Sequence, residues 1–137
     1  MNFFFDNNLS PHIAHAMREL SSATQGVDMV MHLSDRFARN APDLVWIPGL
    51  TADGPWAVLS VDKFKKQGGV EREALRQAGH MVFLLEQQWL KQTFWLQAER
   101  LVRWWPQIVY QTQLASGGAF VVPWRHTSRA KFRVVKL

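Results

Sequence analysis

The chain has 137 residues, a length that suits one domain with a single hydrophobic core. Hydrophobic residues make up 47% and charged residues 20%, which excludes an intrinsically disordered chain, and the lack of cysteine excludes disulfides and thiolate metal sites. The formal net charge of +5 favours a polyanionic partner such as nucleic acid. Neither a secretion signal nor a run of about 18 apolar residues is present, so the sequence predicts a cytoplasmic protein without membrane contact.

The first expected element is a buried strand formed by the aromatic run at residues 2–5, which ends at Asp6. Ser10 and Pro11 are suitable for the N-cap and the first position of a helix. Apolar residues then follow at helical spacing as far as Leu20, so a helix is expected after Pro11.

A second strand is expected at residues 30–33, shortly before Asp35. Pro42 suits the start of a further helix with Asp43 in its first turn, where a negative side chain favours the helix dipole. Pro48 indicates either a kinked helix or two short turns.

A third strand is expected at residues 56–61 and ends at Asp62. The apolar stripe within residues 70–78 predicts a third helix that stops at Gly79, and residues 81–85 predict a fourth strand that ends at Glu86. Each of these strands therefore leads directly to an acidic residue.

The last elements are a long helix from Trp89 to Trp105, with Pro106 as a kink or a new start, and a fifth strand at residues 119–124. Alternating strands and helices predict an α/β domain with a mostly parallel sheet of about four to five strands and helices on both faces. We expect one domain over residues 1–124 and a basic C-terminal extension over residues 125–137.

Several acids follow strands, and the ends of parallel strands meet along one edge of a sheet, where ligands of open α/β folds bind. These acids are Asp6, Asp35, Asp62 and Glu86, and Asp43 lies early enough in its helix to reach the same edge. Carboxylates that share a site repel one another unless a cation lies between them, and oxygen ligands without cysteine suit Mg²⁺ or Mn²⁺. In a basic protein, such a site indicates cleavage of phosphodiesters by a metal-activated water.

Local turn and cap chemistry is the alternative explanation for an acid after any one strand. Asn7 and Asn8 are either turn formers or donors that orient Asp6. Candidate RNA-binding residues are basic side chains after the third strand and in the extension, namely Lys63, Lys65, Lys66, Arg125 and Arg129.

The motifs FFFDNNLSPHIAHAMREL, MHLSDRF, DLVWIPGL, PWAVLSVDKF and GGAFVVPW resemble the VapC45-like branch of PIN-like domains, and the resemblance extends to about Trp124. It implies a three-layer α/β/α sandwich and a divalent-metal-dependent endoribonuclease with Mg²⁺ or Mn²⁺ in an acidic pocket. Many such relatives are toxins of toxin–antitoxin pairs, which implies an antitoxin partner and a homodimer.

The resemblance assigns catalytic and metal-binding roles to Asp6, Asp43 and Asp62. Related domains often carry another acid two residues after the position of Asp62, where this chain has Phe64. Asp35 is therefore the candidate for a fourth metal ligand.

Three other functions fit parts of the pattern. The DNNLS segment resembles the nucleophile loop of haloacid-dehalogenase-like phosphatases, but Asn8 stands where their general acid is found. A response-regulator receiver has the same coarse topology, but it requires an acidic pair after the first strand, where this chain has Asp6 and Asn7. A PIN-like module that binds RNA or a partner with little or no cleavage is the third alternative, because Phe64 leaves one acid fewer.

Overall fold

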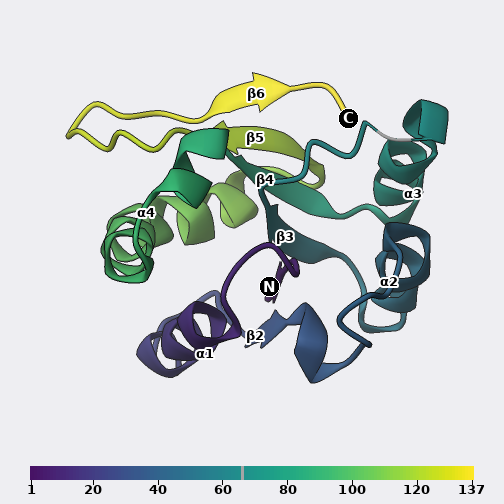
Figure 1. Ribbon diagram of the computed structural model, residues 1–137, viewed down its shortest axis with the longest axis horizontal. Helices are drawn as coiled ribbons and strands as arrows, with labels where there is room; N and C mark the ends of the chain where they lie inside the picture. Colours follow the sequence, from purple (N-terminus) through teal and green to yellow (C-terminus); the bar gives the residue numbers. More distant parts are fainter. Residues whose placement is uncertain (66) are drawn as a thin grey trace.

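A computed structural model describes residues 1–65 and 67–137, and its centre is a six-stranded sheet with the order β2-β1-β3-β4-β5-β6 (Figure 1). Lys66, one of the predicted RNA-binding residues, lies outside the described residues. The first five strands are parallel to one another, and the sixth is antiparallel to β5. The strands are β1 (Asn2–Phe5), β2 (Met29–His32), β3 (Trp56–Ser60), β4 (Met81–Leu85), β5 (Gly118–Val122) and β6 (Arg133–Val135).

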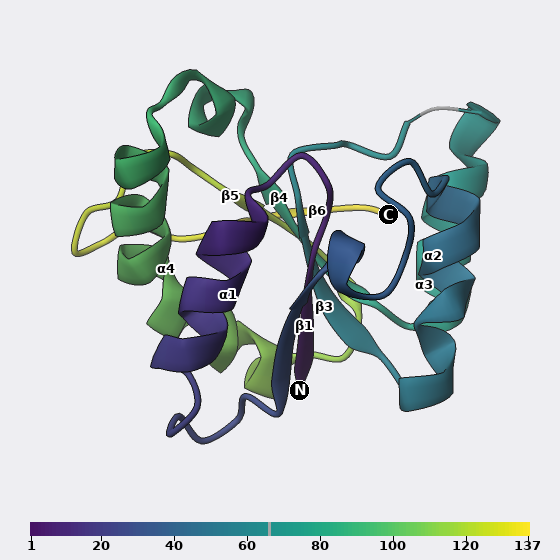
Figure 2. The ribbon, with the colours of Figure 1, turned by 60° about the horizontal axis from the view of Figure 1, so that its bottom comes forward.

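Helices cover both faces of the sheet, which gives the predicted three-layer α/β/α sandwich (Figure 2). Helices α1 (Pro11–Leu20) and α4 (Phe94–Leu114) pack on one face, and α2 (Asp43–Gly49) and α3 (Val70–Ala78) pack on the other. Within the part of the chain that the structure describes, no helix has the length and apolar character needed to span a membrane.

Strand β1 contributes to both hydrophobic cores. Phe3 and Phe5 belong to the core beneath α1 and α4, whereas Phe4 belongs to the core beneath α2 and α3. The ring of Phe3 lies 4.9 Å from that of Trp105, and the ring of Phe4 stacks on Trp46 at 4.7 Å between centroids. The aromatic run thus explains a central strand that is buried on both faces.

Local capping signals correctly predicted two helix ends. The Ser10 hydroxyl accepts the backbone N–H of His12 at 3.1 Å, and Pro11 is the first residue of α1. Gly79 ends α3 in a left-handed conformation, with φ of 73°.

The long helix begins later than the sequence predicted. Residues Gln87–Lys91 form a 3₁₀ helix, and α4 begins at Phe94 because the Thr93 hydroxyl caps it by accepting the N–H of Leu96. Pro106 lies within α4 and does not end it. Pro48 similarly lies inside α2, in its last turn.

The expected C-terminal extension contains one strand more than the sequence pattern indicated. Strand β6 pairs with β5, with Arg133 opposite Val121, so this part of the basic segment belongs to the sheet. Val135 and Leu137 pack against the core beneath α2 and α3. A domain boundary at residue 124 remains a prediction.

The Phe4→Ala substitution should strongly destabilise the protein. Phe4 is fully buried against Trp46 and Trp56, and removing an aromatic ring from such a site costs about 3–5 kcal/mol through lost burial and a residual cavity. Urea unfolding followed by tryptophan fluorescence measures the change. Phe94→Ala is the matched control, because Phe94 is 40% exposed and its loss should cost much less. Equal losses for both variants would contradict the described packing.

Candidate metal centre

Asp6 lies at the carboxyl edge of the sheet, directly after β1, which is the second strand in the sheet order. Its backbone N–H donates to the carbonyl of Leu59 in β3 at 3.0 Å, which continues the pairing of the two strands by one residue. The side chain is 6% exposed. The location of Asp6 is therefore fixed by backbone pairing rather than by a flexible loop.

Burial raises the pKa of Asp6 from 3.8 to about 6. Hydrogen bonds oppose this rise: the Ser60 hydroxyl donates to Oδ2 at 2.8 Å, and the Asn7 backbone N–H donates to Oδ1 at 2.7 Å. The charges of Asp43 and Asp62 contribute to the raised pKa, so these two carboxylates lie near enough to Asp6 to repel it. The structure thus brings the three acids named by the resemblance into one electrostatic neighbourhood.

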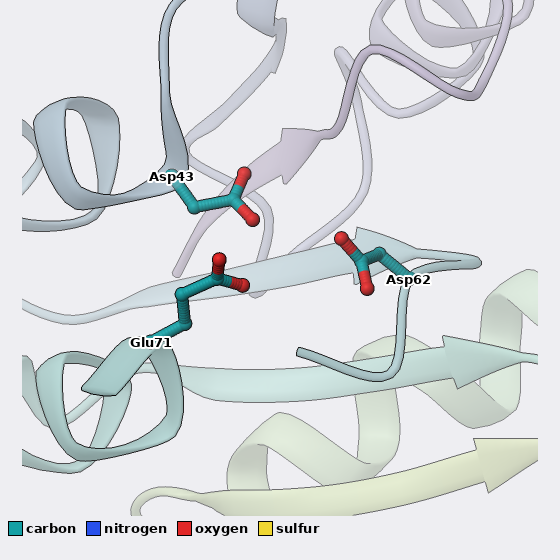
Figure 3. Close-up of side chains that lie close together, drawn as sticks. All are labelled: Asp43, Asp62 and Glu71. Atoms are coloured by element: carbon teal, nitrogen blue, oxygen red, sulfur yellow. The ribbon is translucent and has the colours of Figure 1, made fainter. Parts of the chain in front are cut away.

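Three carboxylates form a compact cluster at this edge. One oxygen each of Asp43, Asp62 and Glu71 lies within 4.8 Å of the others, and Figure 3 shows the side chains turned towards one another. Asp43 and Asp62 are partly exposed, whereas Glu71 is buried. The cluster therefore opens to solvent on one side and is enclosed on the other.

Each member of the cluster is held by its local structure. Asp43 is the first residue of α2, and its Oδ1 accepts the indole N–H of Trp46 at 2.9 Å. Oδ1 of Asp62 accepts the backbone N–H of Phe64 at 2.9 Å. Glu71 lies in the first turn of α3, where the helix dipole favours a negative charge.

The buried hydroxyl of Ser60 connects two of the acidic segments. It donates to Asp6 and accepts the backbone N–H of Asp62 at 3.0 Å, and the amide of Asn8 approaches it at 3.4 Å. The Asn8 side-chain oxygen also accepts the backbone N–H of Val61 at 3.3 Å. The backbone N–H of Asn7 thus contacts Asp6 directly, and Asn8 contacts Ser60 and Val61 beside it.

Phe64 is fully buried and packs edge-on against Trp46, with 6.1 Å between ring centroids. It has φ of 53°, a left-handed conformation that is uncommon for a residue with a side chain. The strained turn directs the aromatic ring into the core, two residues after Asp62. Glu71, from the neighbouring helix, supplies a carboxylate to this neighbourhood instead.

Asp35, the predicted fourth ligand, takes part in a different set of interactions. Its two oxygens lie 2.9 Å from Nε2 of His15, and Oδ2 accepts the backbone N–H of His32 at 2.9 Å. Burial alone would raise the pKa of Asp35, but the His32 N–H and His15 outweigh it and lower the pKa. Among the described residues, the compact acidic cluster contains Glu71 and not Asp35.

Lys63 and Lys65 follow Asp62 and are exposed. Arg125 and Arg129 are exposed in the connection between β5 and β6. These positions leave their side chains accessible to a polyanion, and their contact with RNA remains a prediction.

The sequence pattern missed Glu71 and Ser60. Glu71 precedes Ala74 and Leu75 by three and four residues, so it lies on the apolar stripe of α3, an unusual place for a carboxylate. Ser60 is a polar residue inside an otherwise apolar buried strand. Both signals were present in the sequence. The prediction, however, considered acidic residues that follow strands, and neither Glu71 nor Ser60 is such a residue.

The donor set fits a hard divalent cation. The compact cluster consists of Asp43, Asp62 and Glu71, and Asp6 lies outside it but near enough for the charges of Asp43 and Asp62 to raise its pKa. Mg²⁺ and Mn²⁺ prefer carboxylate oxygens as ligands. An α/β/α sandwich with acids gathered at the carboxyl edge of the sheet is the arrangement of a PIN-like domain.

A comparison with protein-family models agrees with this description. The model for the PIN-like domain matches residues 1–87, and the chain belongs to that family. The matched region contains Asp6, Asp43, Asp62 and Glu71, whereas α4, β5 and β6 follow it. Comparisons with curated proteins and with solved structures gave no match.

Asp6→Asn should stabilise the metal-free protein at neutral pH. Because the folded-state pKa of Asp6 is raised, ionisation costs folding free energy that appears as pH rises from 3.8 and is complete above about 6. The gain should be on the order of 2–3 kcal/mol near pH 7 and should largely disappear near pH 4. Denaturant unfolding in EDTA at both pH values measures it. Glu99→Gln, at an exposed residue, is the control, and a gain independent of pH would contradict the assigned ionisation.

Ser60→Ala should weaken binding of Mn²⁺. The substitution removes the hydroxyl donor to Asp6, so the pKa of Asp6 should rise further and less of the ionised ligand should be present at neutral pH. Loss of such a supporting contact typically costs about 10–100-fold in metal affinity. Calorimetric titration with Mn²⁺ measures the change. Ser22→Ala, at an exposed hydroxyl on the carbonyl of Glu19, should leave the affinity unchanged.

Proposed function

We propose that this protein is a divalent-metal-dependent endoribonuclease. The observation that carries the proposal is the cluster of Asp43, Asp62 and Glu71 beside the buried Asp6 in a PIN-like domain. Asp6, Asp43 and Asp62 are the catalytic acids in this proposal, and Glu71 replaces Asp35 as the fourth candidate ligand. The net charge of +5 supports an RNA substrate.

The four carboxylates would hold Mg²⁺ or Mn²⁺, which when bound stabilises negative charge on a phosphoryl oxygen and lowers the pKa of water. The chain's own contribution is to arrange the ligands in advance. The Ser60 hydroxyl orients Oδ2 of Asp6 and opposes the rise in the pKa of Asp6, so that more of the ionised carboxylate is present. Asp43 and Glu71 come from two helices that close the site on one face. The buried side of the cluster limits the approach of substrate to the solvent side.

The contacts of Asn8 support a nuclease over a phosphatase of the haloacid-dehalogenase-like type. In such a phosphatase, the second polar position of the loop exchanges a proton with the leaving group. Here an amide occupies that position and its oxygen accepts the Val61 backbone N–H. Its role in this structure is to hold the loop against β3.

The resemblance to the VapC45-like branch supports a more specific role as the toxin of a toxin–antitoxin pair. In this proposal the protein acts in the cytoplasm as a homodimer, and an antitoxin protein occludes the acidic edge. Expression of the wild-type chain should arrest growth of a bacterial host, and Asp62→Asn should not. Growth arrest by both variants would argue against a toxin that acts through this site.

Cleavage of single-stranded RNA by purified protein tests the proposed activity. We expect cleavage with Mg²⁺ or Mn²⁺ and none in EDTA. Asp62→Asn and Glu71→Gln should each reduce the rate by roughly 100-fold or more, because each removes a charge that holds the cation. A fluorescently labelled oligonucleotide resolved on a denaturing gel provides the rate and the cleavage position.

Glu73→Gln is the matched control for Glu71→Gln. Both residues lie in the first turn of α3, but Glu73 is exposed and pairs with Arg76, so its loss should not affect cleavage. Intact RNA after incubation with folded, Mn²⁺-loaded wild-type protein would contradict the proposal and favour a binding module. Phosphate release from a small phosphomonoester without RNA cleavage would favour the phosphatase.

A further inference from the structure

A cavity of about 300 Å³ lies at the carboxyl ends of β4 and β5 and beside β6. Four basic side chains and one acidic side chain line it. The acidic one is Glu86, whose Oε1 accepts the backbone N–H of Trp124 at 3.0 Å. The basic ones are Lys63, Lys65, Arg72 and Arg133. Positive charge therefore predominates in the lining.

Backbone carbonyls hold the guanidinium group of Arg72 in place. Nε and Nη2 donate to the carbonyl of Lys63 at 3.1 and 2.8 Å, and Nη1 donates to the carbonyl of Lys136 at 2.9 Å. Among the salt bridges of the described residues, none neutralises Arg72 or the other three basic side chains of the lining. Arg72 thus presents a positive charge whose position is fixed before any ligand binds.

The inner lining of the cavity is apolar. Leu84 of β4, Val121 of β5 and Val135 of β6 contribute to it. A surface with apolar side chains on its inner wall and cations around them matches the chemistry of a nucleotide, which combines a phosphate with a sugar and a flat base. The volume lies at the lower end of the range of small-ligand sites.

We propose that this cavity binds one nucleotide of a single-stranded RNA, with Lys65, Arg72 and Arg133 at its phosphate, next to the bond that is cleaved. The proposal rests on the proposed ribonuclease function. Lys63 directly follows Asp62, and Arg72 directly follows Glu71, so the cavity and the acidic cluster are built from the same two chain segments. A nucleotide in the cavity therefore orients the strand relative to the carboxylates.

Arg133 adds to the proposed nucleotide site a residue that lies outside the part of the chain matched by the family model. It lies in β6, beyond the residues that match the PIN-like family model, and it enters the cavity because β6 pairs with β5. The C-terminal strand thereby adds a substrate contact to the domain.

The test compares Arg133→Ala with Lys131→Ala. Both residues are exposed and two positions apart, but Lys131 lines a different cavity beside α4, together with Gln107 and Tyr110. Binding of a labelled single-stranded RNA of ten nucleotides is measured by fluorescence anisotropy in EDTA at several salt concentrations. Arg133→Ala should weaken binding on the order of tenfold and reduce the salt slope by about 0.7, as expected for one lost phosphate contact. Lys131→Ala should change neither.

Equal affinities for the two variants would overturn the proposal. Arg133→Lys retains the charge and should recover most of the affinity. If Arg133→Ala fails to fold by circular dichroism, Lys65→Ala provides the same comparison from an irregular segment outside the sheet. Adenosine monophosphate should displace the RNA from wild-type protein at concentrations where adenosine does not, and equal competition by both would contradict recognition of the phosphate.

This experiment separates the two proposals because it measures binding without cleavage. If wild-type protein leaves RNA intact with Mn²⁺ but Arg133→Ala still binds more weakly than Lys131→Ala, the nucleotide site stands and the ribonuclease function fails. If wild-type protein cleaves RNA and Arg133→Ala binds as tightly as wild type, the nucleotide site fails alone.

Discussion

The burial of a carboxylate at the acidic carboxyl edge of the sheet is the constraint that the surrounding structure satisfies. Asp6 is almost fully buried, and burial, with smaller contributions from the charges of Asp43 and Asp62, raises its pKa to about 6. The Ser60 hydroxyl stabilises the ionised form of Asp6 and also binds the backbone of Asp62, so one buried group orders two acidic segments. A bound cation would relieve the unfavourable charge of the metal-free site, so the burial that makes ionisation of Asp6 costly would also favour metal binding.

The sheet can hold a buried carboxylate such as Asp6 in place because its central strands are buried on both faces. A one-residue shift of β1 would move Phe4 to the core beneath α1 and α4 and would move Phe3 and Phe5 to the other core, so the register that fixes Asp6 is strongly specified. The sequence was sufficient to predict this strand because its aromatic run and its acidic end are local. It could not predict β6, whose three residues become a strand only because the edge of β5 accepts them.

The candidate site was predictable where it depended on strand ends and unpredictable where it depended on strand order. Asp6 and Asp62 follow adjacent strands, so the rule that parallel strands end together correctly indicated their proximity. Asp35 follows β2 at the outer edge of the sheet, where α1 brings His15 to its carboxylate. Glu71 comes from a helix, and its distance from the other acids is set by the packing of α3, which no local pattern encodes.

A nuclease with an acidic centre has to attract a polyanion to carboxylates that repel it. In this chain a basic residue directly follows two of the acids, as Lys63 follows Asp62 and Arg72 follows Glu71. Successive side chains diverge from the backbone, so each pair places opposite charges on two sides of one short segment. The hydrogen bonds from Arg72 to the carbonyls of Lys63 and Lys136 then connect Arg72 to the segment after β3 and to the residue that follows β6. In the proposed nuclease, attraction of the RNA backbone and binding of the cation would therefore fall on neighbouring surfaces, so that neither would have to be weakened for the other.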